Sequence, residues 1–221
     1  MHILGAMNDT NEARIARELQ ISKEGGAADI SGAILRGTEL PVDLKGLEAR
    51  GCEMDGVNGH CARVHSAQLQ GSVLKDGYFL EAWFEDACMD AVSIQGGVYS
   101  LVYMRDVSMR GAMIRDADMS QSLFCEVDMR GAAFYNCNFE SSGLQDLDLR
   151  GAYFYRCNFS GAELEGSNLM GATFEGCTMP ELVGILKAEW PDNLSHIEDD
   201  EQRARALLER HCVIIEDSED V

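Results

Sequence analysis

Cysteine is the residue type with the most evident capacity for chemistry in this sequence, and three of the eight cysteines are evenly spaced. Cys137, Cys157 and Cys177 lie twenty residues apart. If the chain returned to the same place every twenty residues, their sulfur atoms would be near enough for a disulfide or a metal. Glycine or alanine occupies the three equivalent positions before them, so the position accepts small side chains in general. We therefore interpret the three cysteines as small core residues.

A second candidate for chemistry is the segment GHCARVH, which offers His60, Cys61 and His65 as zinc ligands. Zinc sites of this kind usually draw on a second pair of ligands, and none follows at a suitable spacing. The sequence favours surface residues here, and it predicts no metal site and no cofactor.

Catalysis needs convergent polar groups in a partly desolvated pocket. The sequence contains no Ser/His/Asp arrangement and no glycine-rich phosphate loop. A five-residue period in the sequence also turns the charged side chains outward from a filled core. We predict a protein that is not an enzyme.

The elements that position these residues follow an unusual period of five. In FYNCNFESSGLQDLDLRGAYFYRCNF, large apolar residues recur at every fifth position from Phe134 to Phe159. A strand changes face at every residue, and a helix turns by about 100° per residue, so neither keeps a five-residue period on one side. The residue two before each large one is small or apolar, as at Ala132. Each pentapeptide therefore predicts a very short strand with two inward residues, followed by a corner.

Glycines and a longer repeat indicate how the corners close. Fourteen of the 22 glycines lie two residues after the large apolar position, where a corner requires a positive φ. The segments VDMRGAAFYNCNF, LDLRGAYFYRCNF and SNLMGATFEGCTM begin at Val127, Leu147 and Ser167, twenty residues apart. Four pentapeptides per coil predict a four-sided solenoid whose coils stack through backbone hydrogen bonds.

The register is long enough to specify a complete core. It continues unbroken from Leu44 to Met179, which is 28 pentapeptides or seven coils, and none of the 56 inward positions from Val42 to Met179 is charged. Three more inward residues precede a one-residue slip at Pro41, namely Ile30, Leu35 and Leu40. At about 4.8 Å per coil, seven coils predict an all-β rod about 34 Å long.

Strings such as ADISG, ADMSQ and SNLMG resemble the A-(D/N)-L-x-x consensus of the pentapeptide-repeat family. The resemblance covers about two thirds of the chain. It implies a right-handed quadrilateral β-helix, here of about seven to eight coils, and the handedness comes from the resemblance alone.

The two ends predict caps, because an open solenoid exposes strand edges. Residues 1–27 predict an N-terminal helical cap, in which Asp9 and Glu12 mark the helix start and Ile15 and Leu19 form its apolar stripe. Residues 28–179 predict the β-helix. Residues 180–221 predict a C-terminal cap with one helix starting at Pro180, a second helix ending near residue 211, and an acidic tail.

The overall charge restricts the partners. With 38 acidic and 18 basic side chains the net charge is −20, which opposes binding to nucleic-acid phosphates and to anionic membranes. A partner steered by this field should be basic. No apolar run approaches the ~20 residues of a membrane span, and MHILGAM is too short for a signal peptide. We expect a cytoplasmic protein with reduced thiols.

Outward residues twenty apart should be neighbours on successive coils, which groups the charges into columns. The first, the acid column, consists of Asp86, Asp106, Glu126 and Asp146. The second consists of Arg110, Arg130 and Arg150, the last two of which follow an aspartate by two residues. The arginines are interpreted as a self-neutralised ladder of little energetic value. The acid column is either an ordinary solvated face or a regular line of negative charge that imitates DNA.

A contiguous set of outward apolar residues is predicted around one corner. This apolar patch consists of Tyr78, Leu80, Trp83, Val98, Leu101, Tyr103 and Leu123. Soluble proteins rarely leave such a patch bare. It should be covered either by a terminal helix of the same chain, through Ile15/Leu19 or Leu207/Leu208, or by a second protein, which includes a homodimer partner.

Two functions follow. The family resemblance implies a DNA mimic that binds DNA gyrase or topoisomerase IV and protects these type II topoisomerases from antibiotics or toxins. The uninterrupted run from Leu44 to Met179 lacks the projecting loops of the quinolone-resistance members, so the loopless gyrase-interacting members are the nearer model. The alternative is a rigid structural or adaptor protein for an unrelated protein partner, since a fold alone does not fix function.

Overall fold

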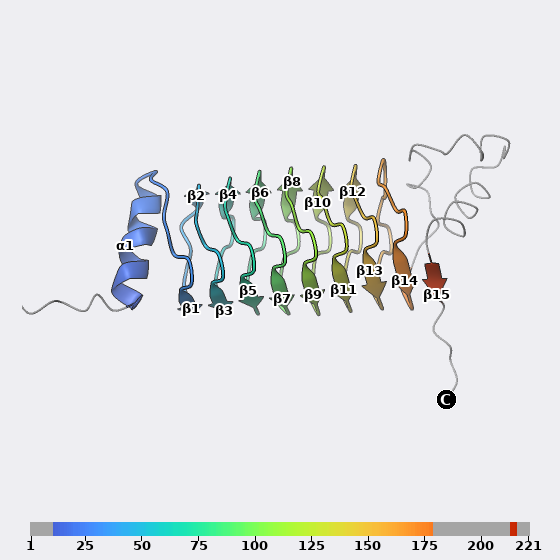
Figure 1. The fold of residues 1–221 in the computed structure, drawn as a ribbon, viewed down its shortest axis with the longest axis horizontal. Coiled ribbons are helices and arrows are strands. Elements are labelled where there is room, and N and C mark those ends of the chain that lie inside the picture. Colours follow the sequence, from blue (N-terminus) through green and yellow to red (C-terminus); the bar gives the residue numbers. More distant parts are fainter. Residues whose placement is uncertain (1–10, 179–212, 216–221) are drawn as a thin grey trace, which may run out of the picture.

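The computed structural model describes residues 11–178 and 213–215, which form one helix and fifteen short strands (Figure 1). The helix, α1, spans Asn11–Lys23 and precedes the first coil. The coils stack in a single row to form a parallel β-solenoid of about seven coils, as the period of five predicts.

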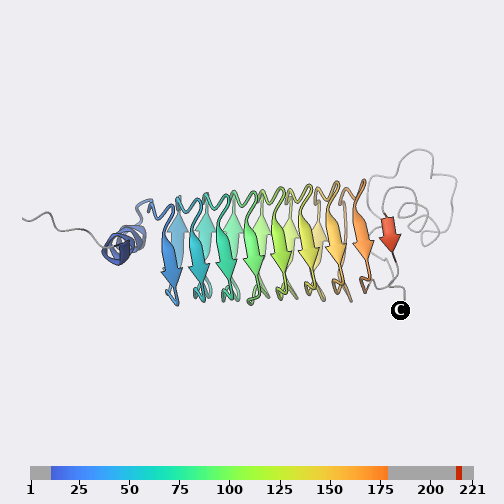
Figure 2. The same cartoon turned by 60° about the horizontal axis from the view of Figure 1, so that its bottom comes forward.

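Two sides of the solenoid consist of strands, and the other two consist of single β-bridges. The nine-stranded sheet contains β1 (Ile34–Arg36), β3 (Glu53–Asp55), β5 (Val73–Lys75), β7 (Ser93–Gln95), β9 (Met113–Arg115), β11 (Ala133–Tyr135), β13 (Tyr153–Tyr155), β14 (Thr173–Glu175) and β15 (Val213–Ile215). The six-stranded sheet contains β2 (Asp43–Lys45), β4 (Arg63–His65), β6 (Trp83–Glu85), β8 (Tyr103–Arg105), β10 (Leu123–Cys125) and β12 (Gly143–Gln145). Figure 2 shows the two sheets on opposite sides of the core, with their strands running in opposite directions.

The pairing register confirms the twenty-residue coil. Phe134 pairs with Phe154 in the parallel ladder, twenty residues on. Leu35 pairs with Met54, only nineteen residues on, because the coil that contains Pro41 is one residue short. This shortening also corrects one expectation: Val42, predicted to face inward, is 55% exposed, while Pro41 beside it is buried.

The corners adopt the predicted left-handed backbone. Glycines such as Gly111 and Gly131 have φ near +60°, and fifteen non-glycine residues in the described part of the chain also have positive φ. Such a conformation costs a residue with a Cβ about 1–2 kcal/mol, and aspartate and asparagine tolerate it best. The stack of coils supplies the hydrogen bonds that hold these corners, for example from the Asp106 N–H to the Cys125 carbonyl at 3.2 Å.

The core is continuous and ordered by stacking between coils. Phe134, Phe154 and Phe174 stack nearly parallel, with successive ring centroids 4.8 Å apart. Phe139 and Phe159 form a second stack at 5.1 Å and meet the first edge-on. Stacked and edge-on aromatic pairs both stabilise beyond the area they bury.

Buried serines in the small inward position satisfy their own hydroxyls. Ser122, Ser142 and Ser167 each donate to a backbone carbonyl 23 residues earlier, at 2.9 Å in each case. No buried polar side chain is therefore left unpaired at these positions, which removes the usual penalty for burying a hydroxyl.

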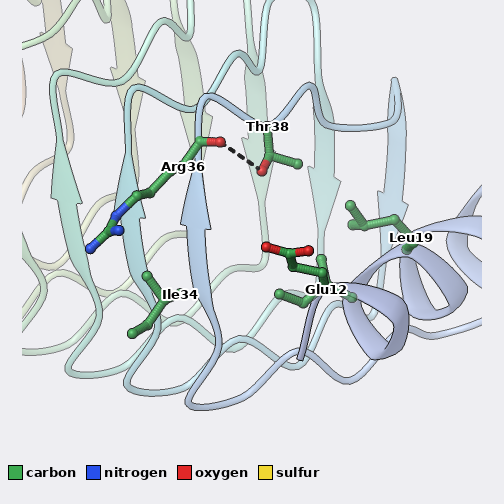
Figure 3. Close-up of a pocket in the computed structure, with 7 residues that line it drawn as sticks. Glu12, Leu19, Ile34, Arg36 and Thr38 are labelled. Atoms are coloured by element: carbon green, nitrogen blue, oxygen red, sulfur yellow. Dashed lines mark hydrogen bonds between the residues drawn. The ribbon is translucent and has the colours of Figure 1, made fainter. Parts of the chain in front are cut away.

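Helix α1 closes the first coil. Its Ile15 and Leu19 side chains belong to the buried core, and the Ser22 hydroxyl donates to the Asp43 carbonyl at 3.1 Å. A groove of about 760 Å³ remains between the helix and β1, with Glu12 and Leu19 on one side and Ile34, Arg36 and Thr38 on the other (Figure 3).

At the other end, β15 extends the nine-stranded sheet. Its residues pair in parallel with β14, so that Phe174 lies opposite Ile214, forty residues later. The sequence pattern did not indicate this strand. The two helices predicted between Pro180 and residue 211 lie outside the described residues. Within the described part of the chain, no helix has both the length and the apolar character needed to cross a membrane.

Candidate protein-interaction surface

The outward side of the six-stranded sheet carries most of the residues singled out in the sequence. Each of its middle strands is entered from a turn and left through a bend, as Leu80–Glu81 and Asp86 flank β6. The acid column occupies the bend after the strands. Of the apolar patch, Trp83, Tyr103 and Leu123 lie on the strands and Leu80 and Leu101 at the turn before them, while Tyr78 and Val98 lie on the adjoining side of single β-bridges. The acid column thus follows one margin of the six-stranded sheet, and the apolar patch lies over the sheet and around its other margin.

All four members of the acid column are exposed, and all four have a φ between 52° and 56°. Asp106 pairs with Arg105 at 3.3 Å, and His65 approaches Asp86 at 3.7 Å. Glu126 and Asp146 form no ion pair with another described residue. Negative charge is therefore least compensated in the second half of the column.

The coil spacing sets the spacing of this charge. Members of the column are related by the twenty-residue register, as the pairing of Cys125 with Gln145 beside them shows. One charge per coil corresponds to about one per 4.8 Å. A single DNA strand carries about one charge per 3.4 Å of helix axis. The two lines of charge are comparable in density.

The arginine column differs from the acid column because it is neutralised within the protein. Arg130 and Arg150 each hold an aspartate two residues earlier, Asp128 and Asp148, at 2.6 Å. These hydrogen bonds with arginine lower the pKa of both aspartates. The interpretation as a self-neutralised ladder is supported, and this side offers little free charge to a partner.

The apolar patch spans three successive coils and is partly exposed: Tyr78, Trp83 and Leu101 are exposed, and Leu80, Val98, Tyr103 and Leu123 are half-buried. Trp83 is 54% exposed and lies with its ring centroid 4.8 Å from that of Tyr103, while Leu123 continues the column on the next strand. Leu101, at the adjoining corner, is 46% exposed. An aromatic centre with acidic residues at its edge has the composition of an interface core and rim.

One candidate occupant of the patch is excluded. Ile15 and Leu19 of α1 are buried against the first coil, so this helix face is not available to cover Trp83. The other intramolecular candidate, Leu207/Leu208, lies outside the described residues.

The cysteines at the small inward position act as the buried serines do. Cys137, Cys157 and Cys177 each direct the thiol to a carbonyl 23 residues earlier, at 3.4–3.7 Å. The seven described cysteines are all free. This geometry supports their interpretation as core residues.

The three residues of GHCARVH do not come together. His65 faces Glu85 through Nδ1 and Asp86 through Nε2, on the six-stranded side. His60 and Cys61 lie at the preceding corner, where Glu81 of the next coil joins them. Desolvation and the Glu81 carboxylate raise the pKa of the Cys61 thiol.

A second outward aromatic group, on the nine-stranded sheet, was not recognised in the sequence. Tyr135, Tyr153 and Tyr155 lie on β11 and β13 with ring centroids 5.8–6.3 Å apart. Arg115 stacks on Tyr135, and Tyr153 donates to Glu175 at 2.6 Å, which raises the pKa of Tyr153 to about 12. Charged neighbours already cover this group, in contrast to the patch around Trp83. The sequence does indicate this group, because Tyr135 and Tyr155 are outward residues twenty positions apart.

The groove beside α1 has no catalytic arrangement. Its lining contains two charged residues, Glu12 and Arg36, and one hydroxyl, that of Thr38, among apolar side chains (Figure 3). A nucleophile with a neighbouring base, or a pair of carboxylates, is not among the residues that line it.

The model of the family described as "Pentapeptide repeats" matches residues 103–140 and 144–179 in eight copies. No curated protein sequence matches the chain.

Solved structures similar to this one include HetL, a pentapeptide repeat protein involved in heterocyst differentiation regulation in the cyanobacterium Nostoc sp. strain PCC 7120. HetL is 19% identical, covers 74% of this chain and 84% of its own, and has a TM-score of 0.43. The trypsin-treated plasmid-mediated fluoroquinolone resistance protein QnrB1 is 15% identical, covers 68% and 85%, and has a TM-score of 0.47. Rfr23 from the cyanobacterium Cyanothece 51142 is 13% identical, covers 75% and 99%, and has a TM-score of 0.26.

The matched repeats are the same pentapeptides that form the coils of the solenoid, and their inward residues build its core. Residues 103–140 and 144–179 of this chain are pentapeptide repeats of this family.

Proposed function

We propose that this protein is a non-catalytic, protein-binding rod and that the outward side of the six-stranded sheet is its binding surface. The observation that carries the proposal is the exposed apolar patch around Trp83, bordered on the same sheet by the acid column. The apolar centre provides area to bury, and the acids provide selection for a basic partner.

The proposed partner is a type II topoisomerase, bound at the surface that otherwise holds DNA. The family resemblance implies this class of partner. The regular exposed carboxylates and the net charge of −20 suit a surface built to receive a phosphate backbone. The proposed location is the cytosol, where the seven free thiols would stay reduced.

A supercoiling assay with purified DNA gyrase tests this function. We expect the protein to inhibit supercoiling at low salt or to protect gyrase from a quinolone. If it does neither, the topoisomerase proposal is wrong and the adaptor function stands.

Neutralising the acid column should weaken binding without unfolding the rod. The variant carries Asp86→Asn, Asp106→Asn, Glu126→Gln and Asp146→Asn, all at exposed positions. We expect the affinity for gyrase to fall at least about tenfold at low salt and the loss to shrink at high salt, because the attraction is Coulombic. Fluorescence anisotropy at two salt concentrations would measure it.

A matched control carries the same charge change on the nine-stranded sheet and the bend that follows its strands. Its four substitutions are Glu53→Gln, Asp55→Asn, Asp76→Asn and Asp116→Asn, again at exposed positions. Equal losses in both variants would show that net charge, and not the column, drives the interaction.

Trp83→Ala tests the apolar centre. Removing a central aromatic anchor typically costs an interface 2 kcal/mol or more, so we expect about a 30-fold loss of affinity for gyrase. Because Trp83 is 54% exposed in the free protein, the melting temperature should change little. Val73→Ala, an exposed aliphatic residue on the nine-stranded sheet, is the control and should leave binding unchanged.

The same variant separates the alternatives for the patch. If the wild-type protein is a dimer and Trp83→Ala is a monomer in analytical ultracentrifugation, a second copy occupies the patch. A large drop in melting temperature with unchanged assembly would instead place part of the same chain on it.

A further inference from the structure

Three different metal-binding side chains converge at one corner of the rod, beside the apolar patch. One ligand atom from each of His60, Cys61 and Glu81 lies within 4.8 Å of the other two. The Cys61 sulfur is 3.4 Å from His60 Nδ1 and 3.7 Å from Glu81 Oε2. The corner is open to solvent, since His60 and Glu81 are exposed and Cys61 is half-buried.

The stacking of coils holds these residues together. Cys61 and Glu81 occupy the same corner position on successive coils, with nearly equal φ of 56° and 57°. Their N–H groups donate to the carbonyls of Leu80 and Ser100 on the following coils, at 2.9 and 3.2 Å. The two backbone positions are therefore fixed about one coil spacing apart, and their side chains leave the rod in the same direction.

The imidazole is also held in place. The His60 N–H donates to the Asn58 side-chain oxygen at 3.0 Å, which fixes the turn that carries it. Its ring meets the Tyr78 ring edge-on, with centroids 5.9 Å apart and an interplanar angle of 74°. The ring thus lies between the patch and the Cys61 sulfur.

The separations match those of ligands around zinc. Zinc bonds of about 2.0–2.1 Å to nitrogen or oxygen and about 2.3 Å to sulfur, in a tetrahedron, place the ligand atoms roughly 3.4–3.6 Å apart. The Cys61–His60 separation of 3.4 Å falls at this spacing and the Cys61–Glu81 separation of 3.7 Å is slightly longer, while all three ligand atoms lie within 4.8 Å of one another. A mixture of thiolate, imidazole and carboxylate is a zinc-type ligand set, whereas magnesium and calcium favour oxygen alone.

We propose that His60, Cys61 and Glu81 bind a zinc ion, with a fourth position open to water or to a ligand from a partner. On binding, the thiol that now donates to Glu81 releases its proton to solvent and a zinc–sulfur bond forms, with no change in oxidation state. His65 takes no part, because its two ring nitrogens face two different carboxylates, Glu85 and Asp86.

Cobalt(II) titration of the reduced, metal-free full-length protein tests the site. We expect one cobalt per chain with a thiolate-to-metal charge-transfer band, and displacement of cobalt by one equivalent of zinc. Cys61→Ser should abolish the band. His60→Ala and Glu81→Gln should each lower the affinity more than about tenfold, in line with the loss of one ligand.

Two thiol controls make the result specific. Cys125→Ser removes a half-buried thiol whose pKa is raised by burial and by Glu126, and it should leave the titration unchanged. Cys212→Ser removes the other cysteine that follows a histidine in the sequence, and it should also leave it unchanged. The proposal is overturned if the wild type shows no charge-transfer band, or if the band survives Cys61→Ser. An unchanged circular dichroism spectrum of Cys61→Ser confirms that loss of the band is not loss of the fold.

Discussion

Phe154→Ala should destabilise the folded protein by about 3–5 kcal/mol, the range for removing a large aromatic ring from a packed core. Phe154 is 2% exposed and is stacked between Phe134 and Phe174, with centroids 4.8 Å from each. Its neighbours are held by their own coils, so they cannot move in to fill the space. Urea denaturation followed by circular dichroism would measure the change in the free energy of unfolding.

Glu140→Gln is the matched control on the same stretch of chain. Glu140 is exposed at the turn that follows Phe139, so the substitution should change stability by less than about 0.5 kcal/mol. Equal destabilisation by the two substitutions would contradict the five-residue register, because that register alone assigns one residue to the core and the other to the surface.

Gly97→Ala should destabilise the protein by about 3 kcal/mol through two effects at one residue. Its φ of +95° is unfavourable for a residue with a Cβ, which costs about 1–2 kcal/mol. A Cβ there would also lie 2.5 Å from the Gly77 carbonyl oxygen and 2.9 Å from the Tyr99 ring, and overpacking of this kind costs about 1–3 kcal/mol. Thermal melting of the variant against wild type would measure the loss.

Gly111→Ala isolates the backbone contribution. Gly111 has a φ of +61°, and nothing lies within 4 Å of the Cβ it would gain. We expect about 1–2 kcal/mol from this change. If Gly97→Ala destabilises the protein no more than Gly111→Ala does, the close contacts of residue 97 with Gly77 and Tyr99 do not limit the side chain that this position can hold.

The glycines around Tyr99 show how the core compensates for large rings. Tyr99 and Phe79 stack with centroids 5.4 Å apart, and the small inward position beside them is glycine on both coils, Gly77 and Gly97. A side chain at Gly59 would also meet the Phe79 ring, at 2.5 Å. Volume is thus conserved across neighbouring coils, which is what a close-packed interior requires.

The solenoid could be predicted from sequence because each coil repeats one local pattern. Burial at Phe134, Phe139 and Phe154 follows directly from the period of five, and the coil length follows from the echo at twenty residues. The pattern failed at Val42, where the shortened coil places Pro41 in the interior instead. A one-residue slip changes which side chains face inward. Which of the neighbouring residues becomes buried depends on the path of the backbone, which the repeat pattern does not specify.

Strand β15 could not be predicted in the same way. Its pairing of Val213–Ile215 with β14 joins segments forty residues apart, and no repeat connects them. The apolar run Val213–Ile215 has only three residues. Its periodicity therefore cannot distinguish a strand from the end of a helix.

Only part of the candidate surfaces could be predicted from the sequence. The acid column and the apolar patch follow from the twenty-residue spacing, because stacked coils place such residues side by side. The group His60, Cys61 and Glu81 is not apparent in the segment from His60 to His65, because Glu81 lies twenty residues after Cys61 in the sequence. The column that relates Cys61 to Glu81 contained the signal, since both occupy the corner position of successive coils.

A competition experiment with purified DNA gyrase tests the central claim, that this acidic rod occupies the surface of a type II topoisomerase that otherwise binds DNA. The wild-type protein, labelled with a fluorophore, is titrated with gyrase at low salt, and duplex DNA is then added to the complex. We expect binding that duplex DNA reverses and that weakens steeply as salt increases. An absence of binding at low salt, or a complex that saturating DNA leaves intact, would contradict it.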